Sequence, residues 1–164
     1  MTPPLIQISI REQRLRLITE QTVFAYACST AANGPGERIG TGCTPRGRHI
    51  VRAKIGQGHP IGAVFQGRRP TGEVWTPQLH ARFPQRDWIL TRILWLSGVE
   101  RGCNRLGQVD TMRRYIYIHG APDTEPMGEP RSHGCIRMRN TDIAALFDHI
   151  PAGCPVEILE GSLP

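Results

Sequence analysis

The segment Ile116–Arg139, IYIHGAPDTEPMGEPRSHGCIRMR, determines how the rest of this 164-residue chain can be interpreted. A run of β-favouring residues, Tyr115 to Ile118, leads into His119, and a stretch rich in proline and glycine follows. The chain then returns with the residues SHGCIR at positions 132–137. An excursion of this kind can bring its two ends together. The segment therefore predicts a cysteine nucleophile beside a histidine, held by a β scaffold.

The residues around Cys135 are the types that thiol chemistry needs. A thiol attacks as the thiolate, so it requires a nearby base or positive charge and partial access. Cys135 follows Gly134 and precedes a predicted helix, a position that leaves backbone N–H groups available for an oxyanion hole. His119 is the candidate base. In an extended segment Arg137 faces the same side as Cys135 and can hold a substrate carboxylate, whereas His133 is expected to help to shape the site rather than to act as the base.

The periodicity of the chain predicts a mainly β domain that spans residues 1–164. Alternation and β-favouring composition predict strands at Leu5–Ile10, Arg14–Ile18, Thr22–Cys28, His49–Ile55, Ala63–Phe65, Trp88–Leu96, Tyr115–Ile118 and Pro155–Leu159. A helix is expected over Asp142–His149, with Asn140 or Thr141 as its cap, because four apolar residues share one face: Ile143, Leu146, Phe147 and Ile150. Residues 31–44 and 67–84 are expected to be loops, and both are candidates for a lid over a cleft.

The composition fits a soluble globular protein rather than a nucleic-acid-binding one. Hydrophobic residues make up 39% and charged residues 21%, and 18 glycines and 14 prolines favour short strands joined by turns. The net charge of +6 comes from scattered arginines, and aromatic residues are only 6%, so a base-stacking platform is not expected. A basic surface suits anionic small substrates. Binding of nucleic acid rests on charge alone and is the weakest alternative.

The five cysteines point to thiols rather than to disulfides or metal. None of them forms a C-x-x-C pair, and the spacing of His119, His133 and Cys135 matches no standard zinc pattern, so no metal or cofactor is expected. Unpaired cysteines fit a reducing compartment. The opening residues, MTPPLIQISIREQRLRL, lack a basic region followed by an apolar run, and no membrane span is expected. These observations predict a cytoplasmic protein, or a periplasmic one if the chain is a trimmed piece of a longer precursor.

A resemblance to a known family adds to this interpretation. His119-Gly120 followed by SHGCIRM at residues 132–138 resembles the signature of the L,D-transpeptidase catalytic domain, the YkuD-like family. The resemblance extends over nearly the whole chain, since residues 28–30 and 44–47 look like further family elements and residues 155–158 look like its closing strand. It implies a β-sandwich with one or two short helices, in which the catalytic cysteine lies in a cleft under a cradle of loops.

The resemblance also assigns roles to individual residues. It implies that Cys135 is the nucleophile, that His119 is the general base, and that the carbonyl of Gly120 orients the imidazole. The N–H groups of Gly134 and Cys135 would form the oxyanion hole. The residues that line the site or bind substrate would be Ser132, His133, Arg137 and Tyr117. Ala121 stands where the family often has threonine.

The reaction implied is acyl transfer on peptidoglycan stem peptides. Cys135 would attack the bond between meso-diaminopimelate and D-alanine, release D-alanine and leave a thioester. Because no export signal is expected, we predict an L,D-carboxypeptidase that trims tetrapeptides of muropeptides to tripeptides in murein recycling. The alternatives are an L,D-transpeptidase that forms cross-links or exchanges D-amino acids, and a non-catalytic murein-binding module. Carbapenem β-lactams are expected to acylate the cysteine.

Overall fold

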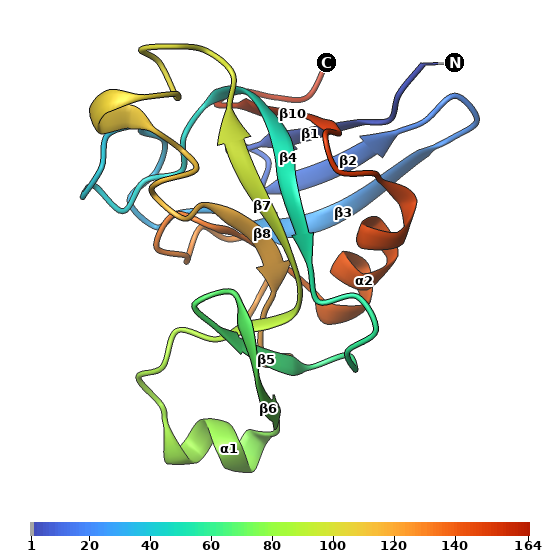
Figure 1. The fold of residues 1–164 in the computed structure, drawn as a ribbon, viewed down its shortest axis with the longest axis vertical. Coiled ribbons are helices and arrows are strands. Elements are labelled where there is room, and N and C mark those ends of the chain that lie inside the picture. The colour runs from blue at the N-terminus through green and yellow to red at the C-terminus, as the bar shows by residue number, and fades with distance from the viewer. Residues whose placement is uncertain (1) are drawn as a thin grey trace.

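Strands make up most of the regular secondary structure of the protein (Figure 1). The computed structural model describes residues 2–164, which form ten strands, two α-helices and one 3₁₀ helix, Gly107–Val109. The strands are β1 (Leu5–Ser9), β2 (Arg14–Ile18), β3 (Val23–Ser29), β4 (Gly47–Ile55), β5 (Ala63–Gln66), β6 (Arg69–Val74), β7 (Ile89–Gly98), β8 (Tyr117–Gly120), β9 (Ile136–Met138) and β10 (Pro155–Leu159). The helices are α1 (Pro77–Arg82) and α2 (Asn140–His149).

Eight of the strands close into a ring. Their order is β4-β10-β1-β2-β3-β9-β8-β7, and β7 pairs back with β4. Most neighbours are antiparallel, but β10 runs parallel to β1 and β9 runs parallel to β8. The hairpin of β5 and β6 pairs with the start of β7 and extends, together with α1, from one end of the ring (Figure 1).

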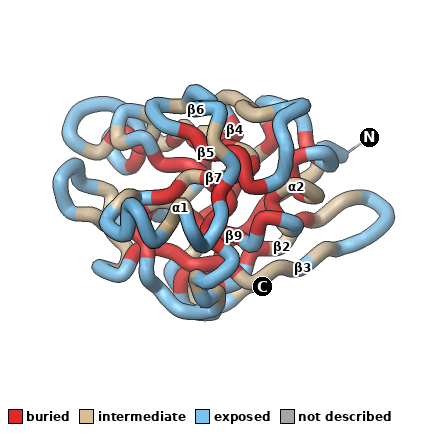
Figure 2. Tube along the Cα trace, turned by 90° about the horizontal axis from the view of Figure 1, so that it is seen from below, coloured by how far each residue is buried: buried red, intermediate tan, exposed pale blue. Residues whose placement is uncertain are grey.

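The main hydrophobic core fills the ring. On β1 and β2, the paired residues Ile6 and Leu17, and Ile8 and Leu15, are all completely buried. Each such side chain contributes about 1.5–3 kcal/mol relative to an exposed position. Figure 2 shows the buried stretches running through the middle of the molecule, with the exposed loops outside them. The apolar residues of the alternating pattern predicted for these strands therefore form the core.

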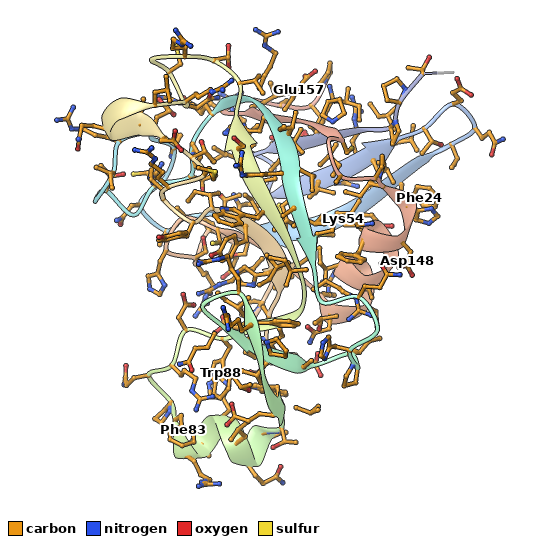
Figure 3. The ribbon with its side chains drawn as sticks, in the orientation of Figure 1. Phe24, Lys54, Phe83, Trp88, Asp148 and Glu157 are labelled. Atoms are coloured by element: carbon orange, nitrogen blue, oxygen red, sulfur yellow. The ribbon has the colours of Figure 1, made fainter. Side chains whose placement is uncertain are left out.

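Helix α2 is fastened to β4 by a lysine. The helix buries Ile143, Leu146 and Phe147 and packs against β7 and β8. Lys54 of β4 donates to the carbonyl oxygens of Phe147 at 2.7 Å and Ile150 at 2.6 Å (Figure 3). A cation at this end of a helix satisfies carbonyl groups that have no partner within the helix. No helix within residues 2–164 has the length and apolar character needed to span a bilayer.

Most of the expected elements are confirmed. The protein is mainly β with two short helices, and its sandwich arises from one sheet that closes on itself. β2 and β10 have the predicted bounds, and the other predicted strands lie within about two residues of theirs. Residues 31–44 form a loop with isolated bridges, as expected. The strand predicted to start at Tyr115 begins two residues later, because Tyr115 adopts a positive φ of 55°.

The prediction of a loop over residues 67–84 is wrong. β6 and α1 both lie in this stretch. β6 contains Pro70 and Gly72 and is largely exposed, so its sequence lacks an alternating pattern, and its pairing with β5 is what makes it a strand. Helix α1 carries a start signal that was missed: Thr76 caps it through a bond to the Leu79 N–H, and Pro77 follows.

Two expectations close to the cysteine are also wrong. Cys135 precedes the three-residue strand β9 rather than a helix. Helix α2 begins at Asn140 with Arg139 in the cap position and no side-chain cap. Asn140 does not cap the helix because its side chain is engaged elsewhere, in bonds described below.

Candidate active site

The pairing of β8 with β9 places the predicted residues on one face of the sheet. In this parallel pair Ile118 lies opposite Ile136, and His119 lies opposite Arg137. Successive side chains of a strand point to opposite faces. Ile118 and Ile136 therefore face the core, and His119 and Arg137 face outward with the neighbouring Cys135. The register of the β8–β9 pair thus places its isoleucines in the core and His119 and Arg137 in the candidate site.

These outward-facing residues line a pocket of about 440 Å³. Gly67 and Arg68, at the tip of the β5–β6 hairpin, form part of its wall. All the side chains predicted for the site reach it, and it is lined by Gly67, Arg68, Asp87, Ile89, Arg114, Tyr115, Ile116, Tyr117, His119, Ser132, His133, Cys135 and Arg137. The structure therefore brings His119 and Cys135, at the two ends of the intervening loop, to the same pocket.

His119 is held as a neutral imidazole. It is buried, and its Nδ1–H donates to the carbonyl oxygen of Gly120 at 2.6 Å. The proton on Nδ1 leaves Nε2 with a free lone pair, which is the form a general base needs. Burial lowers the pKa of His119, and the positive charge of Arg137 adds to this, while the Gly120 bond and Asp87 oppose it.

Gly120 cannot be replaced without moving its surroundings. A Cβ at this position would collide with the Asn140 side chain and would lie 2.7 Å from the Leu90 carbonyl oxygen. The glycine therefore allows β7 and α2 to approach the carbonyl that orients His119.

The Cys135 thiol lies half-buried between two backbone groups. Its sulfur accepts the Tyr117 N–H at 3.3 Å, and the thiol can donate to the Tyr115 carbonyl oxygen at 3.4 Å. Burial raises the pKa of the thiol to about 12, although the Tyr117 N–H, Arg137 and Arg114 favour the thiolate. At neutral pH both the thiol and the imidazole are therefore uncharged.

The turn before Cys135 is closed by one hydroxyl. Ser132 Oγ donates to the Cys135 carbonyl at 2.5 Å and accepts the Gly134 N–H at 3.1 Å. Gly134 has a φ of 134°, a region that favours glycine. Of the two N–H groups predicted to form an oxyanion hole, that of Gly134 is thus engaged by Ser132, and the role of both stays a prediction.

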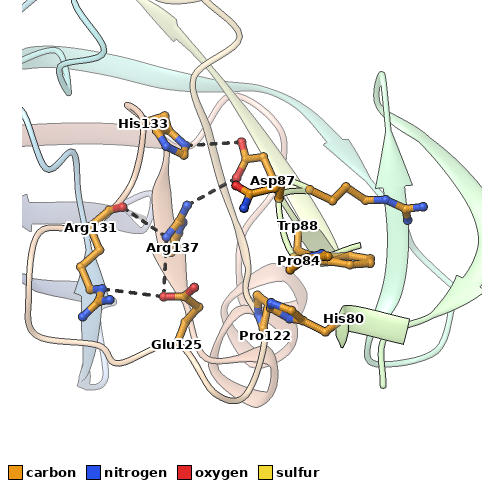
Figure 4. A pocket seen from close by; sticks show the side chains of 11 residues that line it. His80, Pro84, Asp87, Trp88, Pro122, Glu125, Arg131, His133 and Arg137 are labelled. Atoms are coloured by element: carbon orange, nitrogen blue, oxygen red, sulfur yellow. Dashed lines mark hydrogen bonds and ion pairs between the residues drawn. The ribbon is translucent and has the colours of Figure 1, made fainter. Parts of the chain in front are cut away.

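Arg137 is already paired with carboxylates of the protein. Its guanidinium lies 3.4 Å from Asp87 and 3.9 Å from Glu125, and the side chain is 11% exposed (Figure 4). His133 is exposed and lies 3.9 Å from the other oxygen of Asp87. Both residues line the pocket, and their roles toward a substrate stay predictions.

Tyr117 joins the hairpin tip to the pocket wall. Its hydroxyl accepts a bond of 3.0 Å from Arg68. The Arg68 guanidinium also lies over the rings of Trp95, at 4.9 Å, and Tyr115, at 4.8 Å. Cation–π contacts of this kind hold the β5–β6 tip beside the thiol.

A buried polar network behind His119 was not foreseen. Asn140 donates to the Ala121 carbonyl at 2.9 Å and to Asp123 at 3.1 Å, and it accepts from Thr91 at 2.5 Å. Thr91 is buried with a φ of 74° at an irregularity in β7. The network fixes the chain directly after His119-Gly120. A buried asparagine at the start of a helix was visible in the sequence only as a possible cap.

The fold and the site define the family. The chain matches the L,D-transpeptidase catalytic domain, YkuD, over residues 3–158. It belongs to this family of proteins. One curated relative, a probable L,D-transpeptidase ErfK/SrfK of Salmonella typhimurium, is 35% identical over 95 residues, which cover 57% of this chain and 30% of the relative. The matched part therefore spans less than a third of that relative's length.

Solved structures share the fold at low sequence identity. L,D-transpeptidase 3 from Mycobacterium tuberculosis superposes with a TM-score of 0.59 at 16% identity, covering 96% of this chain and 61% of that one. The L,D-transpeptidase LdtMt1 in complex with imipenem gives a TM-score of 0.55 at 18% identity, with coverage of 95% and 58%. At these identities the likeness supports the fold alone.

Proposed function

We propose that the protein catalyses cysteine-dependent acyl transfer on peptidoglycan stem peptides, with water as the acceptor. In this reaction it is an L,D-carboxypeptidase that converts tetrapeptides to tripeptides. The observation that carries the proposal is the shared pocket of Cys135 and His119, in which the Gly120 carbonyl fixes the imidazole with Nε2 free. Family membership supports the substrate class.

The chemistry follows from the protonation states of the site. Cys135 sulfur bonds to the carbonyl carbon of the meso-diaminopimelate–D-alanine amide while its proton passes to His119 Nε2. The C–N bond then breaks, and the imidazolium returns the proton to the leaving amine of D-alanine. A water molecule gives a proton to His119 and adds to the thioester. The C–S bond breaks, the thiol regains its proton, and the tripeptide carboxylate leaves.

Incubation with murein tetrapeptide tests this function. We expect D-alanine and tripeptide to appear in mass spectra with the wild type, and release to fall by more than about 10³-fold for Cys135→Ala, because the nucleophile is lost. The Cys103→Ala variant is the matched control, since Cys103 is exposed and does not line the pocket. Undiminished release by Cys135→Ala would exclude the proposed nucleophile.

A second hollow favours transpeptidation as the alternative. It has a volume of about 250 Å³ and shares Asp87, His133 and Arg137 with the thiol pocket (Figure 4). Its wall carries Glu125 and Arg131, which form an ion pair of 3.9 Å that an amino acid acceptor can open by offering its ammonium group to the glutamate and its carboxylate to the arginine. Addition of a D-amino acid or of a second stem peptide discriminates: exchanged or dimeric products indicate transfer, and tripeptide alone indicates hydrolysis.

Carbapenem labelling separates these enzymes from a non-catalytic murein-binding module. An adduct on Cys135, seen as a mass shift of the intact protein, supports an acylating thiol. The structure of LdtMt1 with imipenem motivates the choice of ligand.

We further propose a cytoplasmic location and a role in murein recycling. All five cysteines are free in the structure, which fits a reducing compartment. Fractionation of cells that express the protein tests the location, and recovery in the periplasm would contradict it.

A further inference from the structure

The thiol pocket contains an arginine that sequence reasoning did not select. Arg114 lies directly before Tyr115, whose carbonyl faces the Cys135 thiol, and its side chain lines the same pocket. Its guanidinium donates to the carbonyl oxygens of Gly36 at 3.2 Å and Cys43 at 2.6 Å. The arginine is therefore half-buried and fixed in place from one side by the loop of residues 31–44.

The charge of Arg114 has no carboxylate partner. The ion pairs among residues 2–164 include none that involves Arg114. Glu37 is near enough to influence it, but both Glu37 oxygens are taken by Arg46, at 2.9 and 3.0 Å. Arg137, by contrast, is paired with Asp87 and Glu125. Arg68, the third arginine of the pocket, has no ion pair among the described residues either, but its guanidinium donates to the Tyr117 hydroxyl and lies over the rings of Trp95 and Tyr115. Arg114 is the arginine without an ion pair that is bound only to backbone carbonyls beside the Gly134–Cys135 turn.

The position of Arg114 places it beside the turn that carries Cys135. The Cys43 oxygen that accepts its bond lies 3.3 Å from where a Cβ of Gly134 would be. The Cys43 carbonyl is thus a neighbour both of the Arg114 guanidinium and of Gly134, the residue before Cys135. In the tetrapeptide, the carboxylate of the terminal D-alanine is only a few bonds from the carbonyl that Cys135 attacks. A planar guanidinium recognises a carboxylate through two parallel bonds.

We propose that Arg114 binds the terminal carboxylate of the D-alanine that leaves, and so makes the site selective for peptides with a free C-terminus. The proposal rests on the carboxypeptidase function proposed above and adds the residue that selects the substrate. It transfers to Arg114 the carboxylate-binding role that the sequence suggested for Arg137. Arg114 would act by direct contact with the substrate.

Two substrates and three variants test this role. The substrates are murein tetrapeptide and the same peptide with a C-terminal carboxamide, compared by the ratio of their kcat/KM values for tripeptide formation. We expect the wild type to favour the free acid by about 10- to 100-fold, as a charge-assisted bidentate contact predicts. Arg114→Met is expected to bring the ratio near one. Arg114→Lys is expected to give an intermediate ratio, since it keeps the charge but not the paired geometry. Arg113→Met, at the exposed neighbour, is the matched control and is expected to keep the wild-type ratio.

Each outcome is decisive. If Arg114→Met lowers both rates equally and keeps the ratio, the arginine only anchors the loop of residues 31–44, and the proposal is overturned. If the wild type hydrolyses neither peptide, the carboxypeptidase function itself fails, and the proposal falls with it. Should the methionine variant not fold, the lysine variant decides, because a ratio unchanged from the wild type would exclude paired recognition of the carboxylate.

Discussion

In the proposed reaction, Cys135 and His119 both start without charge. Burial shifts their pKa values in opposite directions, lowering that of the imidazole and raising that of the thiol to about 12. A preformed thiolate–imidazolium pair would need the reverse order of pKa values. The proton must therefore move from sulfur to Nε2 as the thiol attacks, and substrate that fills the pocket must favour this transfer.

The lowered pKa of His119 predicts an acid-tolerant enzyme. Protonation of the imidazole removes the base, and its pKa lies below the ordinary value of 6.5. The value of kcat/KM for D-alanine release should therefore hold as the pH falls through 6.5 and decline only below it. A profile that loses half of its activity above pH 6.5 would contradict this assignment.

Alkylation probes the thiol directly. Because the Cys135 pKa is raised, its reaction with iodoacetamide should be slow at pH 8 and should still be rising at pH 10. Mass spectrometry of peptides gives the rate at each cysteine, and exposed Cys103 serves as the internal reference. A Cys135 rate that levels off by pH 8 would indicate a thiolate in the resting enzyme.

The short strands β8 and β9 position the residues of the candidate site, and contacts with α2 and β7 fix β8 in place. Asn140 at the start of α2 joins Thr91 of β7 to the Ala121 carbonyl that follows β8. This contact couples three elements that are distant in sequence. His119 is therefore positioned by the packing of whole elements as well as by its own hydrogen bond to the Gly120 carbonyl.

Replacement of Asn140 should loosen this junction. Asn140→Ala removes the donor to the Ala121 carbonyl and the acceptor of the Thr91 O–H, although Thr91 Oγ1 still accepts the Gly62 N–H; this should lower the free energy of unfolding by about 1–3 kcal/mol and also reduce activity. Urea unfolding measures the first effect and D-alanine release the second. Thr141→Ala, at an exposed neighbouring position, is the control and should change neither quantity appreciably. Equal free energies of unfolding for the Asn140→Ala and Thr141→Ala variants would contradict a stabilising role for the Asn140 hydrogen bonds.

The elements differ in how far the sequence predicts them. β1, β2 and β10 carry their own alternation, so their positions follow from local pattern. β6 and β9 do not, because one is exposed and the other has only three residues, and both depend on partners far along the chain or across a turn. In the same way, the sequence shows an arginine at 114 and another at 137 but not which of them has a carboxylate neighbour.

The closed ring encloses a histidine that links stability to pH. His49 of β4 is buried, with Nδ1–H donating to the Gly47 carbonyl at 3.0 Å and Nε2 accepting from Thr111 at 2.9 Å. Burial lowers its pKa to about 4. The unfolded chain binds a proton near pH 6.5, whereas the folded protein does so only near pH 4, so acid favours unfolding across that interval.

Acid should therefore destabilise the fold through His49. The loss should begin near pH 6.5, amount to about 3 kcal/mol by pH 4, and level off below that value. His119, whose pKa is also lowered, adds to it. His49→Gln, which keeps hydrogen-bonding atoms at the site, should flatten the pH dependence of the free energy of unfolding measured by urea titration. A variant that keeps the full wild-type slope would rule out His49 as its source.

The order of strands in the ring has a consequence for synthesis. β10 is translated after every other strand of the ring, yet it lies between β1 and β4. Until Pro155–Leu159 is available, β1 and β4 each lack one neighbour and the ring of strands is open between them. β8 and β9, by contrast, end at Gly120 and Met138, before β10 begins at Pro155, and they pair with β7 and β3. The strands that carry the thiol site therefore all precede the strand that closes the ring.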